Sequence, residues 1–202
     1  MTLPPPRPKE FFRYTDPIGF TYICILAVRP ANSKWFLKAF IGGFKEASQN
    51  TIELHDDDPQ NFEYMLRFLY TTEMAIPSLT KNANSKQKIQ RKILIPIGVF
   101  ILADKYEIGR LLRHTKSQVE SGMRNYSNLF EDDVTIPIIV AAYYSNCARA
   151  ESGTGAVIAR GMIDHATRWL RFGNLDTLKG IVIHSGHFAA DLIIAMRSAE
   201  KT

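Results

Sequence analysis

The chain has 202 residues, of which 46% are hydrophobic and 22% are charged, and its formal net charge is +5. This composition is typical of a globular protein with a packed core, so a chain that is disordered throughout is excluded. A surplus of five positive charges is too small to indicate a nucleic-acid-binding protein by itself. The two cysteines, Cys24 and Cys147, lie far apart. This favours free thiols in a reducing compartment over a secreted disulfide framework.

Residues 1–19 contain five prolines, and we expect them to form a flexible tail. They lack the apolar core of a signal peptide. The longest apolar runs, residues 20–28 and 93–103, are shorter than a bilayer span. We therefore expect a soluble protein inside the cell, in the cytoplasm or the nucleus.

The first structured part is expected to alternate strands and helices. Residues 20–28 are rich in aromatic and β-branched side chains, which predicts a strand. A helix is expected over residues 33–40, with Ser33 as its cap and a glycine pair behind it. Residues 51–54 alternate as a half-buried strand does.

The clearest helical pattern follows an acidic turn. Residues 56–59, three aspartates and a proline, supply an N-cap, negative charge for the helix dipole and a proline at the first helical position. Phe62, Met65, Leu66 and Leu69 then follow the i, i+3, i+4, i+7 spacing of one helical face. The pattern predicts an amphipathic helix here.

Residues 80–92 differ in character, because they are basic and contain no acid. The positive side chains are Lys81, Lys86, Lys88, Arg91 and Lys92. We expect a solvated surface loop. The alternative is a patch for nucleic acid, although no aromatic residues are interleaved to stack on bases.

Helical spacing dominates the rest of the chain, with a hinge expected over residues 125–135. The sequence therefore predicts three parts: a proline-rich tail over residues 1–19, an α+β domain over residues 20–125, and an all-helical extension over residues 126–202.

No pattern of residues indicates chemistry. His184 and His187 offer only two ligands, whereas zinc needs three or four. Gly153 and Gly155 lack the third glycine of a dinucleotide-binding loop. No nucleophile motif is present. We expect no enzyme activity, cofactor, metal ion or small-molecule ligand.

Five segments resemble, in the same order, successive elements of a BTB/POZ domain in the form common in filamentous fungi. They are Ser33–Phe40, Gly43–Ser48, Thr51–Leu54, Phe62–Thr71, which resembles a helix that ends in Leu-Tyr-Thr-Gly, and Leu102–Tyr106, which resembles an Ala-Asp-Lys-Tyr signature. This resemblance implies an α+β fold in which helices flank a small sheet. The N-terminal strands are abbreviated, since Leu26–Asn32 replaces the family's His-Lys region. Homodimerisation through that region is left open.

The resemblance also implies protein–protein interaction. In cullin-binding members, a hydrophobic residue, any residue and an acid precede the second strand, and Phe44, Lys45 and Glu46 occupy these positions. With Tyr64 on the adjoining helix, they are the candidate partner-binding residues. We expect protein partners, a cullin or a second copy of the chain, and neither a membrane nor nucleic acid. The hypothesis is a substrate adaptor of a cullin-type ubiquitin ligase, and the alternative is a transcription- or chromatin-associated regulator that uses residues 80–92.

Overall fold

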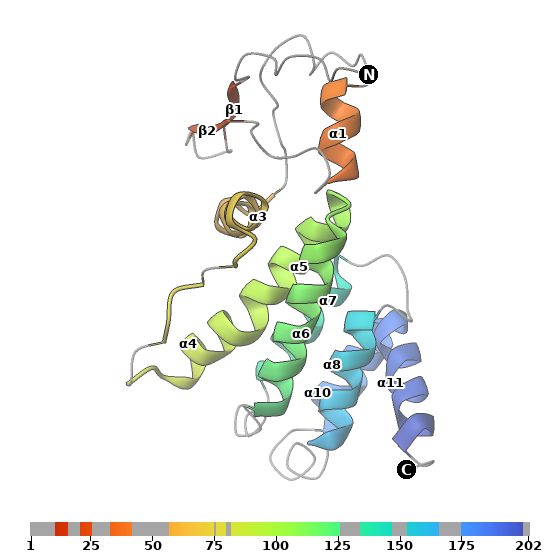
Figure 1. Ribbon diagram of the computed structural model, residues 1–202. Coiled ribbons are helices and arrows are strands. Elements are labelled where there is room, and N and C mark those ends of the chain that lie inside the picture. The colour runs from red at the N-terminus through yellow and green to blue at the C-terminus, as the bar shows by residue number, and fades with distance from the viewer. Residues whose placement is uncertain are drawn as a thin grey trace. The chain divides into compact units, whose positions relative to one another are not determined.

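The computed structural model describes residues 11–15, 21–25, 33–41, 57–74, 76–79, 82–125, 134–146, 153–165 and 175–199 (Figure 1). Their elements are the strands β1 (Phe11–Thr15) and β2 (Thr21–Ile25), the helices α1 (Lys34–Ile41), α3 (Pro59–Thr71), α4 (Ser85–Ile89), α5 (Ile95–Lys105), α6 (Gly109–Asn125), α7 (Thr135–Tyr144), α8 (Gly153–Asp164), α10 (Leu175–His184) and α11 (Gly186–Ala199), and the π-helical segment η2 (Gln90–Leu94).

The expectation of an α+β fold is wrong. Helices dominate the described residues, and the sheet among them is limited to the antiparallel pair of β1 and β2, with Phe11 opposite Ile25. An alternating pattern indicates a strand only where a neighbouring strand can pair with its backbone. β2 lies inside residues 20–28, and β1 lies inside residues 1–19, where we expected a tail. The strand expected over residues 51–54 lies outside the described residues.

By the density of its internal contacts, the chain divides into two compact units. The first unit comprises Met1–Ala75 and Leu102–Leu111, and the second comprises Ile76–Ile101 and Leu112–Thr202. These limits differ from the expected division at residue 125, because α5 and α6 each contribute residues to both units. The boundaries of the tail, the domain and the extension stay a prediction.

Helix α3 forms as the sequence predicts. The carboxylate of Asp58 accepts a hydrogen bond of 2.8 Å from the backbone N–H of Asn61, and Pro59 occupies the first turn. Phe62 and Met65 are buried on the apolar face. Burial of this face stabilises the helix against its first-unit neighbours, since amphipathic packing contributes more than intrinsic propensity.

The expectation of a loop over residues 80–92 is wrong, because α4 and η2 occupy most of this segment. The side chain of Asn84 accepts from the N–H of Gln87, and the side chain of Gln87 accepts from the N–H of Asn84, which makes a capping box. Ile89 and Ile93 are buried, so the helix has an apolar face. The neighbouring lysines made this face difficult to predict from the sequence.

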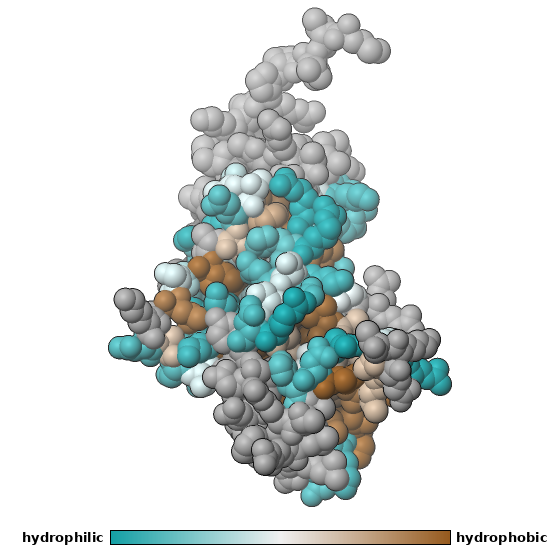
Figure 2. Space-filling view, turned by 60° about the horizontal axis from the view of Figure 1, so that its bottom comes forward, coloured by the Kyte–Doolittle hydropathy of each residue, from teal (hydrophilic) through white to brown (hydrophobic). Residues whose placement is uncertain are grey.

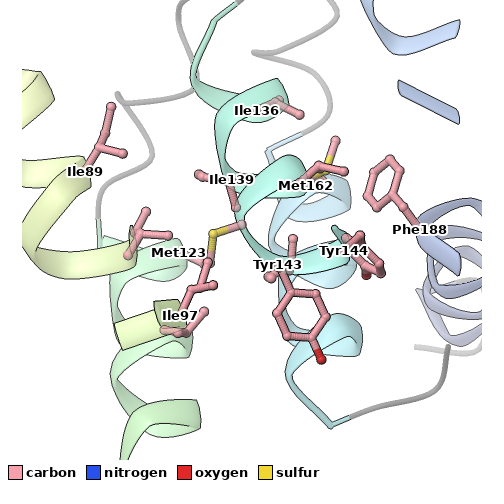
Figure 3. Packing of buried hydrophobic residues seen from close by; sticks show 13 residues of the cluster. Ile89, Ile97, Met123, Ile136, Ile139, Tyr143, Tyr144, Met162 and Phe188 are labelled. Carbon is pink, nitrogen blue, oxygen red and sulfur yellow. The ribbon is translucent and has the colours of Figure 1, made fainter. Parts of the chain in front are cut away.

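The core of the second unit gathers side chains from six consecutive helical elements, α4 to α8 with η2, and from α11 (Figure 3). Three aromatic rings of this core contact one another in a row. The ring centroids of Tyr143 and Tyr144 are 4.8 Å apart, and those of Tyr144 and Phe188 are 5.4 Å apart. The hydroxyl of Tyr144 donates to the buried carboxylate of Asp191 over 2.8 Å. The cluster consists of Ile89, Ile93, Ile97, Val119, Met123, Ile136, Ile139, Val140, Tyr143, Tyr144, Ile158, Met162 and Phe188.

Within the described ranges, no single helix is both long and apolar enough to cross a membrane. Among the described helices, α10 and α11 reach the necessary length and composition only when taken together, and they are bent by 113° at the break between them.

Candidate protein-interaction surface

Two neighbouring residues at the end of α5 hold a buried carboxylate in the first unit. Tyr106 is completely buried, and its hydroxyl donates to Oδ2 of Asp57 over 2.5 Å. The ammonium group of Lys105 donates to Oδ1 of the same carboxylate over 2.7 Å. A buried carboxylate needs such partners on both oxygens, because an unpaired one loses its hydration without compensation.

Tyr106 also positions α1. The hydroxyl of Ser33 donates to the backbone oxygen of Tyr106 over 2.6 Å and accepts from the N–H of Phe36 over 3.1 Å, which confirms Ser33 as the cap of α1. The ring of Tyr106 stacks on Phe36 with centroids 5.2 Å apart and meets Trp35 and Phe62 edge to face at 4.9 and 5.9 Å. One buried tyrosine therefore ties α1, α3 and the end of α5 together.

The turn after α5 ends the helix with a Schellman motif. The N–H of Ile108 donates to the oxygen of Ala103 over 2.8 Å, and the N–H of Glu107 donates to the oxygen of Asp104 over 3.1 Å. Glu107 occupies the left-handed position, with φ 53°, where glycine is usual. Its carboxylate lies 3.4 Å from the ammonium group of Lys38, and both groups are exposed. The turn thus places an ion pair on the outside of α1.

Helix α3 presents a polar outer face opposite its buried one. Glu63 and Arg67 form an ion pair of 2.6 Å one turn apart, and Tyr70 is 44% exposed a further turn along. The helix ends at Thr72, whose φ of 61° is again left-handed. A β-branched residue in this conformation is strained.

These features lie in a segment that matches a known family. Residues 24–121 match the family model of the BTB/POZ domain. This part of the chain is similar to a BTB/POZ domain. No curated protein matches the chain. A BTB/POZ domain is a general protein–protein interaction module, so the exposed groups on α1, α3 and the turn after α5 are candidate contact positions for a protein partner.

Of the four residues expected to bind a partner, the structure describes one, Tyr64. Phe44, Lys45 and Glu46 lie within the matched residues but outside the described ones, three to five positions after the end of α1. Tyr64 is only 8% exposed, so it belongs to the buried residues of α3. A partner contact by Tyr64 stays a prediction.

The exposed side chains of α3 were not among the residues expected to bind a partner. Arg67 and Tyr70 lie on the helical face opposite Phe62 and Met65. The spacing of Glu63 and Arg67, four residues apart outside the apolar positions, is a signal that could have found this face.

The second unit has an apolar surface of its own. An open groove with a volume of about 430 Å³ lies between α7 and α10, where Pro137, Ala141 and Ile181 contribute to its walls. Figure 2 shows brown apolar patches between teal hydrophilic residues on the face that it presents. The large exposed apolar side chains of this unit are Val134, Ile138, Ile183, Ile193, Ile194 and Met196.

Two histidines of the described residues bind backbone oxygens. A ring nitrogen of His184 donates to the backbone oxygen of Gly180 over 2.6 Å, and one of His165 donates to that of Met123 over 3.1 Å. A carbonyl oxygen only accepts, so each of these ring nitrogens carries a proton. Among the residues that the structure describes, no group of three or more His, Cys, Asp or Glu side chains could hold a metal ion.

Proposed function

We propose that this chain is a non-enzymatic adaptor inside the cell, whose BTB/POZ domain binds a cullin through Phe44 and Glu46. The observation that supports this proposal is the anchoring of α1, which ends at Ile41, shortly before these two residues. The ring stack of Phe36 on Tyr106 and the Ser33 cap give the helix a defined position in its unit. A pre-positioned contact loses less conformational entropy on binding.

The chemistry of the two residues suits a protein interface. An exposed aromatic ring can fill a pocket on a partner helix, and a nearby carboxylate can set the register of the contact. The exposed pair of Lys38 and Glu107 would supply polar groups at the rim of such an interface. Recruitment of a substrate to the ligase would then fall to other surfaces of the chain.

Calorimetric titration of the purified chain with the N-terminal region of a cullin tests the proposal. We expect a Kd of about 1 μM or tighter, corresponding to about 8 kcal/mol. Glu46→Lys and Phe44→Ala should each abolish binding. Glu73→Lys makes the same charge reversal at an exposed position after α3 and should leave binding unchanged. A folded chain that does not bind the cullin, or that binds equally well in all variants, would contradict the proposal.

A further inference from the structure

Helices α6 and α8 of the second compact unit pack side by side and run in the same direction. A Cβ atom on Gly153 would lie 2.7 Å from Nζ of Lys116, and one on Gly161 would lie 2.8 and 3.0 Å from Cε and Cβ of Met123. These two contacts are seven residues apart along α6 and eight along α8, which is about 10–12 Å along each helix axis. The first residue of α8 therefore lies beside Lys116.

Two cations of α6 lie close to the start of α8. Lys116 is half-buried, and its ammonium group approaches Gly153. Arg113 is exposed and lies one helical turn before Lys116. At about 100° per residue, Arg113 falls between Lys116 and Met123 around the helix axis, and the latter two both lie against α8. Arg113 is therefore on the side of α6 that faces α8, about 4.5 Å beyond Gly153 along the axis.

No acid of the described residues pairs with either cation. The acid of α6, Glu120, pairs with Arg124, and the acid of α8, Asp164, pairs with Arg160. The other ion pairs found in the described part of the chain include neither cation. Because the N-terminus of a helix is itself positive, cations beside it are unfavourable in the isolated chain. An anion that binds between them makes the arrangement favourable.

A buried hydroxyl points to a ligand at the same place. Thr154 is completely buried, and its Oγ1 atom has no hydrogen-bond partner among the described residues. Thr154 precedes Gly161 by seven residues, so it shares the face of α8 that packs against α6. Helical side chains tilt toward the N-terminus, which directs this hydroxyl to the start of α8. A buried polar group of this kind needs an explanation, and an acceptor brought by a ligand supplies one.

We propose that Arg113, Lys116 and the first turn of α8 bind a phosphoryl group. Two cations match its charge of about −1.5 to −2 at pH 7. Its three oxygens can accept from a guanidinium, an ammonium group, a hydroxyl and backbone N–H groups together, whereas a carboxylate has only two oxygens. Arg113 and Gly153 are exposed, so the group can be free phosphate or the side chain of a phosphorylated partner protein. The site is separate from Phe44 and Glu46 and does not depend on a cullin.

An NMR titration of the isotope-labelled full chain tests this proposal. The probe is a short peptide of glycine and alanine that contains one phosphoserine. We expect the amide signals of Gly153, Thr154 and Gly155 to shift, with a Kd of about 1 mM or tighter. A peptide with glutamate in place of the phosphoserine should bind several-fold more weakly, because it offers less charge and fewer acceptors.

Inorganic phosphate distinguishes the two sources of the phosphoryl group. Binding of the phosphopeptide that is tighter than that of inorganic phosphate would support the site and identify a phosphorylated protein. Binding of inorganic phosphate that is equal or tighter would support the site and identify the free ion.

The two cations have matched control variants in the same unit. Arg113→Gln and Lys116→Gln should each weaken phosphopeptide binding about fivefold or more, since each removes a charged donor. Lys86→Gln and Lys92→Gln remove the same charge from α4 and η2. The backbone of Lys92 meets α6 at Gly122, six residues beyond Lys116. These two variants should change the Kd by about twofold at most, because salt screens charges at such a distance.

A variant of the buried hydroxyl separates loss of binding from loss of folding. Thr154→Val keeps the shape of the side chain and removes the hydroxyl. Its thermal midpoint should equal or exceed that of the wild type, because no partner of this hydroxyl is found in the described part of the chain. The same variant should bind the phosphopeptide about fivefold more weakly.

Four outcomes would overturn the assignment. They are no shift at the start of α8 in the folded wild-type chain, equal binding of the glutamate peptide, equal weakening in the cation variants and their controls, and unchanged binding in Thr154→Val. Phe44→Ala should retain phosphopeptide binding, which keeps this test distinct from the cullin titration.

Discussion

The hydroxyl of Tyr106 and the carboxylate of Asp57, 49 residues apart in the chain, form a buried hydrogen bond of 2.5 Å. Asp57 precedes α3, and Tyr106 follows α5. The bond therefore joins two segments of the first compact unit that are distant in the sequence. Lys105 occupies the second carboxylate oxygen. The Lys-Tyr pair of the Ala-Asp-Lys-Tyr segment therefore has a structural role that its sequence does not reveal.

Tyr106→Phe should destabilise the protein by about 2 kcal/mol, because one oxygen of a buried carboxylate loses its donor. Urea unfolding followed by circular dichroism would measure this loss. Tyr64→Phe is the matched control, since Tyr64 is also buried but no hydrogen bond of its hydroxyl is found among the described residues. Similar losses in both variants would show that the Asp57 bond contributes little.

Thr72→Gly should stabilise the protein by about 1 kcal/mol, because glycine adopts the left-handed φ of 61° without steric strain. Thr71→Gly makes the same chemical change one residue earlier and should have the opposite sign. Thr71 is helical, and its hydroxyl donates to the oxygen of Arg67 over 2.8 Å. Thermal unfolding of the two variants would compare them directly, and destabilisation by both would disprove strain at Thr72.

Gly122→Ala should destabilise the protein by about 1–3 kcal/mol, because the added methyl group would meet the backbone oxygen of Lys92. This oxygen belongs to a helix and cannot rotate away as a side chain can. Gly180→Ala is the contrasting change, since nothing lies within 4 Å of the new Cβ atom. It should stabilise α10 by about 0.5–1 kcal/mol through helix propensity. Equal effects in a denaturant titration would contradict close packing between η2 and α6.

Asp58→Ala should destabilise the protein by about 1 kcal/mol, because the N–H of Asn61 loses its capping acceptor. Asp58→Asn keeps an acceptor oxygen and should lie much closer to the wild type. Chemical denaturation would measure both variants. Equal losses in the two would mean that the charge of Asp58, and not its hydrogen bond, stabilises α3.

Local patterns were sufficient for several elements. Residues 57–71 contain every signal that α3 needs. The acidic turn and the proline mark the helix start and complement its dipole, and the apolar spacing marks the face that is buried. This helix could therefore be predicted from its own segment alone. Ser33 as the cap of α1 was likewise readable from its position before an apolar run. In both cases the groups that interact lie within a few residues of one another.

The basic segment shows why other elements could not be predicted. Its lysines suggested a solvated loop, but Ile89 and Ile93 belong to a buried cluster with residues of α6, α7 and α8, which the local sequence does not contain. Tyr64 shows the same limit at a candidate site, since its place on the helix that adjoins Phe44 and Glu46 suggested a contact residue, whereas the structure buries it. Burial is a property of the whole unit, so a window of ten residues cannot determine it.

The sequence by itself determined the helical character of α3 and α1, the BTB/POZ resemblance and the surplus of positive charge. Only the tertiary structure decided that helix replaces the expected α+β arrangement in the described residues, that Asp57 pairs with Tyr106, and that Ile89 and Ile93 of the basic segment lie in the core. The physical reason is the range of the interactions. Caps, dipoles and helical spacing act over a few residues, whereas burial and buried polar pairs join residues that are distant in the chain.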